Sequence, residues 1–243
     1  DLTFEAKAAL DEGENEITFA AEDKYGNITE EKRSIKYVKD ENSPHFVNGI
    51  AYARRTEDAV KIDGKLDESD WKTDLKISRQ VLGAFPANNI VNFGLLWDDK
   101  NLYIGAEVRD GKLFWDNKAP YLNDSIEFLL NPSNEKAGAF TADDRQVFTG
   151  PINGDLNSHY QNKNISIECE YNIHKDGYTV EIAVPWSEMK KNPGIGEKIG
   201  FEIVCNDDDL GGSNRDSIQT WTSEIQDYYG LTTTFGTIEL TDK

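Results

Sequence analysis

The sequence of 243 residues is poor in the residue types on which several classes of site depend, with two cysteines, three histidines and one methionine. The histidines and cysteines are scattered, which argues against a zinc site. The single methionine, Met189, falls on a predicted helical turn, where it would make a poor axial ligand for haem. No GxSxG motif occurs, and no histidine has the companion pattern of a nucleophilic triad. These absences disfavour metal-thiolate, haem and triad chemistry.

The two cysteines, Cys169 and Cys205, are too few for a disulfide framework. Both alternate with apolar residues and therefore fall on the apolar side of their predicted strands. Two buried thiols that act as small hydrophobic side chains are expected. A buried bridge between them is the alternative, and the sequence does not decide between the two.

Basic residues and long apolar runs are also scarce. Lysine and arginine number 26 against 45 aspartates and glutamates, which gives a formal net charge of −19. Phosphates would be repelled, so no nucleic-acid partner is expected, and an anionic membrane surface is disfavoured for the same reason. No run of about 18 apolar residues is present, so no membrane insertion is expected. No signal peptide is recognisable, and the chain begins within a pattern, DLTFEAKAAL, so we expect a piece of something larger. We expect a monomer within a larger multidomain chain.

What the sequence has in abundance is alternation of apolar and polar residues with a period of two. The alternating segments are residues 91–97, 102–109, 126–130, 165–173, 178–184, 198–206 and 234–240. Turn residues at Asp98–Lys100 and at Asp176-Gly177 indicate two hairpins. The one credible helical turn is Pro185–Lys191. Many short strands separated by turns predict an all-β, antiparallel two-sheet β-sandwich, jelly-roll-like, whose apolar sides face each other and whose polar sides face water.

The first forty residues carry an alternation of their own, with a turn at Gly26-Asn27. The pattern resembles the last strands of a bacterial immunoglobulin-like module. We therefore expect residues 1–40 to be the C-terminal strands of an immunoglobulin-like domain, 41–47 to be a linker, and 48–243 to be the main sandwich. Three strands cannot close a sandwich alone, so the first segment either packs on the main domain or is the remnant of a neighbour.

Six motifs follow one another in order along the main sandwich. They are KIDGKLDESDW, LLWDDKNLYIGAEVRD, NDSIEFLLNP, DGYTVEIAVPW, KIGFEIVCNDDD and FGTIEL. From about Asn48 to Leu240, which is about four fifths of its length, the chain resembles a family 9 carbohydrate-binding module of the DOMON-like sandwich group. The resemblance implies a β-sandwich, bound calcium, and recognition of sugars, often at the reducing end of a glucan or xylan chain. It implies no catalysis.

Two aromatic rings sandwich the sugar in this family, and the resemblance places them at Tyr121, in PYLNDSIE, and at Tyr229, in DYYGLTTTFG. Better-studied relatives have tryptophan at both places, so the smaller face of tyrosine predicts a weaker or different affinity. Trp115 and Tyr228 lie near enough in sequence to substitute. For each ring, simple packing on a loop is the alternative.

Three polar residues are predicted to bind the sugar hydroxyls, because an unpaired polar group in a desolvated slot costs about 1–3 kcal/mol. Glu127 is the matching acid, and it alternates with apolar residues so that it should face out of the core. Gln146 and Gln226 are the predicted amide partners. A solvated sheet face with cross-strand pairs is the alternative for these side chains.

The chain departs from the family where an arginine and an asparagine are expected, because it has Phe148 and Gly150 there. The basic group at the anomeric end of the sugar is therefore missing unless Arg145 or Arg109 replaces it. This departure puts reducing-end specificity in doubt.

Acidic loops suggest a structural calcium ion, which takes six to eight oxygen ligands from flexible loops. The candidate ligands are Asp110 with Asp124, Asp63 with Asp67, and Asp207 with Asp208. None follows the spacing of an EF-hand. In the first acidic loop, residues 60–71, Gly64 should allow a tight turn and Trp71 should cap the core, with acids that are solvated or bound to an ion rather than catalytic.

The sequence therefore predicts a non-catalytic carbohydrate-binding module. It would target a secreted or cell-surface polysaccharide-degrading enzyme to glucan or xylan chains. A glycosidase would need two facing carboxylates, and no active-site motif supplies them. The alternative is a structural or adhesive spacer of a surface-layer-type protein that has lost sugar binding.

Overall fold

The computed structural model describes residues 13–22, 24–37, 46–47, 50–83, 89–151 and 165–242. The chain forms two compact units, Asp1–Ser43 and Pro44–Lys243. The first unit contains an antiparallel hairpin of β1 (Gly13–Glu22) and β2 (Ile28–Tyr37), and Gly26 in its turn has a φ of 84°. The turn is confirmed, whereas the immunoglobulin-like assignment stays a prediction. Except for residues 46–47, the predicted linker lies outside the described residues.

The second unit is all-β, with four short 3₁₀ turns among the described residues. Its strands are β3 (Phe46–Val47), β4 (Ile50–Arg55), β5 (Leu75–Ile77), β6 (Arg79–Leu82), β7 (Ile90–Trp97), β8 (Asn101–Arg109), β9 (Ser125–Asn131), β10 (Arg145–Thr149), β11 (Glu168–His174), β12 (Gly177–Pro185), β13 (Lys198–Asp207), β14 (Ser217–Thr220) and β15 (Gly236–Thr241). The 3₁₀ turns are η1 (Pro120–Leu122), η2 (Trp186–Met189), η3 (Tyr228–Gly230) and η4 (Thr232–Thr234). No helix of the described part is long and apolar enough to cross a bilayer.

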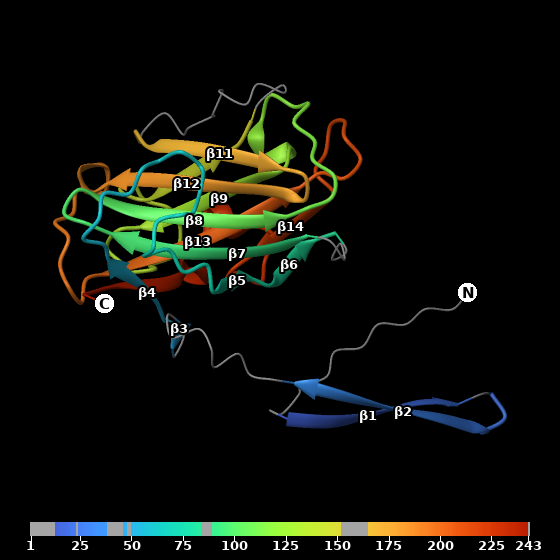
Figure 1. Cartoon of the computed structure of the whole chain (residues 1–243). Coiled ribbons are helices and arrows are strands. Elements are labelled where there is room, and N and C mark those ends of the chain that lie inside the picture. The colour runs from blue at the N-terminus through green and yellow to red at the C-terminus, as the bar shows by residue number, and fades with distance from the viewer. Residues whose placement is uncertain are drawn as a thin grey trace. The chain divides into compact units, whose positions relative to one another are not determined.

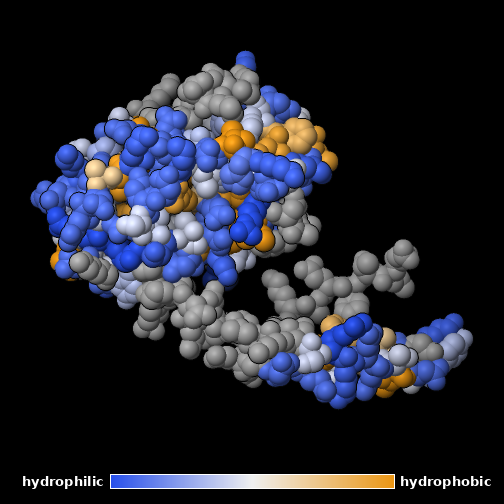
Figure 2. All heavy atoms as spheres, viewed as in Figure 1, coloured by the Kyte–Doolittle hydropathy of each residue, from blue (hydrophilic) through white to orange (hydrophobic). Residues whose placement is uncertain are grey.

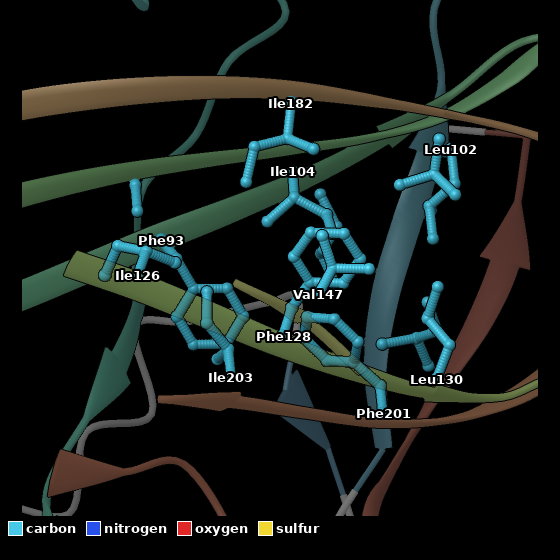
Figure 3. Packing of buried hydrophobic residues seen from close by; sticks show 14 of the residues in the cluster. Phe93, Leu102, Ile104, Ile126, Phe128, Leu130, Val147, Ile182, Phe201 and Ile203 are labelled. Carbon is cyan, nitrogen blue, oxygen red and sulfur yellow. The ribbon is translucent and has the colours of Figure 1, made fainter. Parts of the chain in front are cut away.

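The strands pair in the order β10-β9-β13-β15-β4-β7-β8-β12-β11, and the ladder folds over so that its two halves face each other (Figure 1). Phe93 of β7 and Ile104 of β8 point toward Phe128 of β9 and Phe201 of β13 (Figure 3). The rings of Phe93 and Phe201 lie 6.3 Å apart between centroids. The apolar sides of the two layers thus form one buried core, as predicted for a β-sandwich.

Strand β4 departs from the predicted antiparallel pairing, because it runs parallel to both β15 and β7. Tight hairpins join only antiparallel strands, and β4 is joined to these neighbours by long stretches of chain. The predicted hairpins are confirmed: β7 and β8 meet around Asp98–Lys100, and β11 and β12 meet at Asp176-Gly177. The predicted helical turn is present as η2, and Cys169 and Cys205 are free and buried, not bridged.

The polar side of β9 and β13 does not face water, contrary to the prediction. A second apolar cluster covers it, formed by Leu129, Val204, Ile218, Tyr228 and Phe235. Its last two members belong to residues 221–235, which connect β14 to β15 and which we call the C-terminal cover. The cover buries two strand carboxylates, Glu127 and Glu202. Alternation along a strand could not reveal this second layer.

Residues 60–71, which we call the N-terminal cover, lie over the outer side of β8 and β12. Trp71 packs there with Leu96 and Tyr103 rather than on the central core, which corrects its predicted place. Gly64 has a φ of 79°, and a Cβ there would lie 2.7 Å from the Asn172 backbone nitrogen, so the predicted tight turn is confirmed. The face of the second unit that Figure 2 shows is largely hydrophilic with small apolar patches.

Candidate functional site

One cavity of the second unit gathers aromatic and polar side chains that are distant in the sequence. Its volume is about 380 Å³, and it is lined by Tyr121, Glu127, Gln146, Phe148, Arg215, Tyr228 and Tyr229. These residues come from η1, β9, β10, the loop between β13 and β14, and η3. Four of the six predicted sugar-binding residues therefore lie around the same cavity.

The walls of the cavity are aromatic and partly exposed. Tyr121 is 38% exposed and Tyr229 is 49% exposed, although both are large apolar rings. Phe148 stands beside Tyr121, with 5.4 Å between ring centroids and 50° between planes. Tyr228 meets the edge of Tyr229 at 5.8 Å and 85°. Ring faces held in place by other rings are surfaces on which a flat apolar ligand face can stack.

Glu127 lies at the floor of the cavity with only 1% of its surface exposed. Gln146 Nε2 donates to Oε1 over 2.7 Å, and the Tyr228 hydroxyl donates to Oε2 over 2.9 Å. Burial raises the pKa of Glu127, and the hydrogen bonds from Gln146 and Tyr228 together with the charge of Arg215 oppose that rise. The side chain points out of the core as predicted, but the C-terminal cover encloses it.

Arg215 is the only lysine or arginine that lines this cavity among the described residues. Its Nη1 donates to the backbone oxygen of Tyr121 over 3.1 Å and to Asn206 Oδ1. Its Cζ lies 5.7 Å from the centre of the Tyr121 ring. Sequence reasoning missed this residue, because it lies in an irregular loop 94 positions from Tyr121.

Arg145 and Arg109, the two possible replacements for the missing basic group, do not line the cavity. Arg145 is buried and donates to backbone carbonyls, with Nη2 bonded to Glu188 O over 2.9 Å and Nη1 to Ala142 O over 3.0 Å. Arg109 is exposed and pairs with Glu107 over 3.6 Å. Both side chains are engaged elsewhere, so neither supplies a basic group to this cavity.

Two further predicted residues also lie away from the cavity lining. Trp115 is half-buried and donates from Nε1 to the backbone oxygen of Asp124 over 2.9 Å. Gln226 is exposed on the C-terminal cover. The structure thus uses Trp115 to join two loop segments, and it gives Gln226 no place among the lining residues.

The start of the C-terminal cover is held by Glu202 of β13, which is completely buried. Its carboxylate accepts from three consecutive backbone N–H groups, those of Trp221, Thr222 and Ser223, and from the Thr222 hydroxyl. Burial raises the pKa of Glu202 to about 7, and these hydrogen bonds oppose the rise. Glu202 therefore positions the segment that carries Tyr228 and Tyr229.

A group of three carboxylates lies at the ends of β8 and β13. One oxygen each from Asp110, Asp207 and Asp209 lies within 4.8 Å of the others. Burial and the charges of the other two aspartates raise the pKa of Asp110 to about 6. Asp110 Oδ2 and Asp209 Oδ1 are buried without a hydrogen-bond partner among the described residues, and the nearest cation is Lys112 Nζ, 3.9 Å from Asp209. Sequence reasoning missed Asp209.

Asn89 and Asp124 adjoin this carboxylate group. Asn89 Nδ2 donates to Asp207 Oδ1 over 2.8 Å, and its own Oδ1 is buried without a partner among the described residues. Asp124 accepts from the backbone N–H groups of Phe114 and Asp208, and burial raises the pKa of Asp124 to about 9. Oxygen ligands without histidine or cysteine suit a hard cation such as calcium.

The other predicted ligands lie apart from the group. Asp63 pairs with Lys61 over 2.7 Å and with Lys65 over 3.4 Å, and its hydrogen bond to Lys61 lowers the pKa of Asp63. Asp67 is exposed on the N-terminal cover. Asp208 Oδ1 accepts from the backbone of its own loop. Of the aspartates predicted to bind calcium, the structure places Asp110 and Asp207 in one group of carboxylates.

Residues 62–243 match the family described as carbohydrate family 9 binding domain-like. Exoglucanase XynX of Acetivibrio thermocellus is 32% identical over 183 residues, which cover 75% of this chain and 16% of that protein. Endo-1,4-beta-xylanase A of Thermoanaerobacterium saccharolyticum is 32% identical over 184 residues, which cover 75% of this chain and 15% of that protein. The chain thus spans about one sixth of the length of these relatives.

A solved structure of a family 9 carbohydrate-binding module from Caldicellulosiruptor kristjanssonii, in complex with cellotriose, is similar in fold. The TM-score is 0.66 and the identity 25%, over 79% of this chain and 93% of that chain. The module in complex with glucose aligns equally well, over 95% of its chain. The β-sandwich architecture is therefore shared with a solved sugar-bound module.

Proposed function

The chain belongs to the carbohydrate family 9 binding domain-like family, and from this premise we propose that its aromatic cavity binds sugar rings of glucan or xylan chains. The module is non-catalytic, like the modules of its family in xylanases and exoglucanases. In the proposed complex one sugar ring lies between Tyr121 and Tyr229.

The observation that carries this proposal is the composition of the cavity. A pyranose offers apolar C–H faces and a rim of hydroxyl groups, so it needs ring surfaces for the first and hydrogen-bond partners for the second. Tyr121 and Tyr229 expose ring surface to the cavity, while Gln146 and Arg215 offer polar groups between them. A volume of about 380 Å³ falls within the range of about 300–1,000 Å³ for small-molecule sites.

The role of the module follows from its relatives, of which it matches about one sixth. We propose that it is one part of a longer chain that degrades polysaccharides outside the cell or at its surface. Binding would hold the catalytic part near its polymer, since linked sites raise the effective concentration of the second binding partner. A neutral polymer also suits a protein with a net charge of −19.

We further propose that Asp110, Asp207 and Asp209, with Asn89, hold a structural calcium ion. Two buried carboxylates and a half-buried one repel one another unless a cation or protons balance them. The buried oxygens without partners, on Asp110 and Asn89, are groups that a cation would satisfy. The ion would tie the end of β8 to the end of β13.

Replacing Tyr229 by alanine should weaken binding of cellotriose or xylotriose by about 1–3 kcal/mol, because one stacking surface is lost. This is a 5- to 150-fold increase in Kd, on the order expected for an aromatic anchor. Isothermal titration calorimetry on the full chain measures it. Tyr25→Ala is the matched control, since Tyr25 is a 77% exposed tyrosine in the other compact unit.

The alternative, a spacer that has lost sugar binding, draws support from Glu127. Both of its oxygens already accept hydrogen bonds from the protein. In addition, Phe148 stands where an arginine is expected from the family. Affinity gels cast with soluble xylan or β-glucan separate the two functions. Unretarded migration in every gel, together with no calorimetric signal from oligosaccharides, would leave the spacer as the function.

A further inference from the structure

The carboxylate group and the aromatic cavity lie on opposite sides of the same strand end. Asp207, a member of the carboxylate group, is the last residue of β13, and Asn206 precedes it. Successive side chains of a strand point to opposite faces of the sheet, so Asn206 shares the face of Val204. On that face Val204 belongs to one apolar cluster with Tyr228, which lines the cavity. Adjacent residues of β13 therefore face the two proposed sites.

Asn206 is completely buried and uses both ends of its amide. Nδ2 donates to Ser125 Oγ over 3.2 Å, and Oδ1 accepts from Arg215 Nη1. Each of these partners donates to a backbone carbonyl of η1. Ser125 Oγ bonds to Pro120 O over 2.7 Å, and Arg215 Nη1 bonds to Tyr121 O over 3.1 Å. The backbone of η1, and with it the proposed stacking ring of Tyr121, is thus held through Asn206.

Asp124 makes a second connection, at the start of β9. It precedes Ser125, and its Oδ1 accepts from the Asp208 backbone N–H over 3.0 Å, while Oδ2 accepts from the Phe114 backbone N–H. The loops that follow β8 and β13 therefore both attach to the residue beside Ser125. Both loops start at strand ends that carry the carboxylate group. The group and η1 are consequently joined along two routes.

The carboxylate group is the incomplete part of this network. A buried polar network holds its members in one arrangement when each of them is satisfied. Here Asp110 Oδ2 and Asn89 Oδ1 are buried without a partner among the described residues. A cation would satisfy these oxygens and balance the charges that drive the ends of β8 and β13 apart. Fixing those ends would also fix η1, because Asn206 and Ser125 join them.

We propose that Asn206 is a positioning residue that couples the two sites, so that a cation at the carboxylate group and a neutral sugar in the cavity each strengthen the binding of the other. This inference rests on the proposed sugar-binding function and on the proposed calcium site. The coupling acts through Tyr121, which lines the cavity, whereas the three aspartates of the carboxylate group do not. Coupling free energies are reciprocal, so calcium and sugar must tighten each other's binding by the same factor.

Calorimetric titration of the full chain with cellotriose measures the coupling, at a temperature below the unfolding midpoint of the chelated protein. Cellotriose should bind about 5- to 50-fold more tightly in 10 mM calcium than in chelator, within the range typical of coupled sites. Titration of calcium into protein saturated with cellotriose should lower the calcium dissociation constant by the same factor. Ionic strength is held constant with sodium chloride, so that the comparison reports calcium alone.

Ser125→Ala removes the hydroxyl between Asn206 and η1, and Ser125 is neither a proposed metal ligand nor a lining residue of the cavity. The effect of calcium on cellotriose affinity should fall below about 2-fold in this variant, while calcium still raises the unfolding midpoint as in wild type. Asn206→Ala should lose the coupling in the same way. Ser223→Ala is the matched control, because Ser223 is also a buried serine and donates to Ile225 O on the C-terminal cover. Its coupling factor should equal that of wild type.

The outcomes separate this inference from the proposals beneath it. If wild type binds cellotriose equally well in calcium and in chelator while calcium raises the unfolding midpoint, both sites stand and the coupling is wrong. A wild-type coupling factor in both Ser125→Ala and Asn206→Ala would overturn the role of Asn206, because these residues would then serve stability alone. If wild type binds none of the oligosaccharides or soluble polymers, the sugar-binding function is wrong and the coupling with it.

Discussion

Addition of 10 mM calcium to the chelated protein should raise its free energy of unfolding by about 4 kcal/mol, if the dissociation constant of the site is about 10 µM. For a domain of this size, the midpoint of thermal unfolding should rise by about 8–16 °C. The physical reason is that a cation binds the folded carboxylate group of Asp110, Asp207 and Asp209, which the unfolded chain does not assemble. Calorimetric scans in chelator and in calcium measure the shift.

Asp110→Asn is the decisive variant for this prediction. Asp110 Oδ1 accepts from Lys112 N, while Oδ2 has no partner among the described residues. The amide keeps the first contact and removes one negative charge, so the variant should be at least as stable as wild type in chelator. It should lose most of the response to calcium. Asp63→Asn is the matched control, since Asp63 pairs with lysines, and it should respond like wild type.

A wild-type midpoint that does not move with calcium would contradict the metal site. So would an Asp110→Asn variant with an unchanged response. Magnesium serves as a second comparison, because it demands a tighter octahedral shell and keeps its water, so its effect should be smaller.

Replacing Glu202 by alanine should lower the free energy of unfolding by about 3–5 kcal/mol at pH 5, because a cavity forms and buried donors lose their acceptor. Three backbone N–H groups and the Thr222 hydroxyl depend on this one side chain. Denaturant unfolding measures the change. Sugar affinity should fall as well, because the freed segment carries Tyr228 and Tyr229.

Glu181→Ala is the matched control for that prediction. Glu181 is also completely buried, and it holds the N-terminal cover through the backbone N–H groups of Asp63 and Gly64 and through the Trp71 indole. Its loss should destabilise the protein to a similar extent and leave sugar affinity unchanged. Equal loss of sugar affinity in both variants would contradict a specific role of Glu202 in positioning the cavity.

The raised pKa of Glu202 predicts that the stability of the protein depends on pH. The pKa of Glu202 is raised to about 7 in the folded protein from an ordinary value of 4.5. The folded state therefore holds this proton more tightly, so the contribution of Glu202 is fully present below pH 4.5 and is lost as the pH rises through about 7. Glu202→Gln cannot ionise, so its stability relative to wild type should improve over this range. A difference that is independent of pH would contradict the raised pKa.

Much of the architecture could be predicted from periodicity. Alternation of apolar residues marked β7, β8, β9, β12 and β13, and the Asp176-Gly177 pair marked a hairpin, because both signals are local in the chain. Strands such as β4 and β14 were not predicted. β14 has only four residues, SIQT, of which one is apolar, so it is too short to show alternation. The parallel pairing of β4 joins segments that no turn connects.

The residues of the cavity and of the carboxylate group also divide into those that the sequence predicted and those that it did not. The family motifs selected Tyr121, Glu127, Gln146 and Tyr229, which the structure brings around one cavity, although their role in sugar binding stays a prediction. Arg215 and Asp209 were missed because both lie in an irregular loop. Neighbours in such a loop follow no period, and their partners are distant in sequence.

The sequence by itself determined that the chain is a β-sandwich with a family 9 pattern, because strand alternation and the order of the motifs can be read directly from the order of the residues. Only the tertiary structure decided what lies against the outer faces of the sheets. There the two covers bury Glu127, Glu181 and Glu202. The β13–β14 loop places Arg215 beside the aromatic rings of the cavity. The physical reason is that burial and charge balance depend on the sum of distant contacts, and a one-dimensional pattern records only the neighbours of each residue.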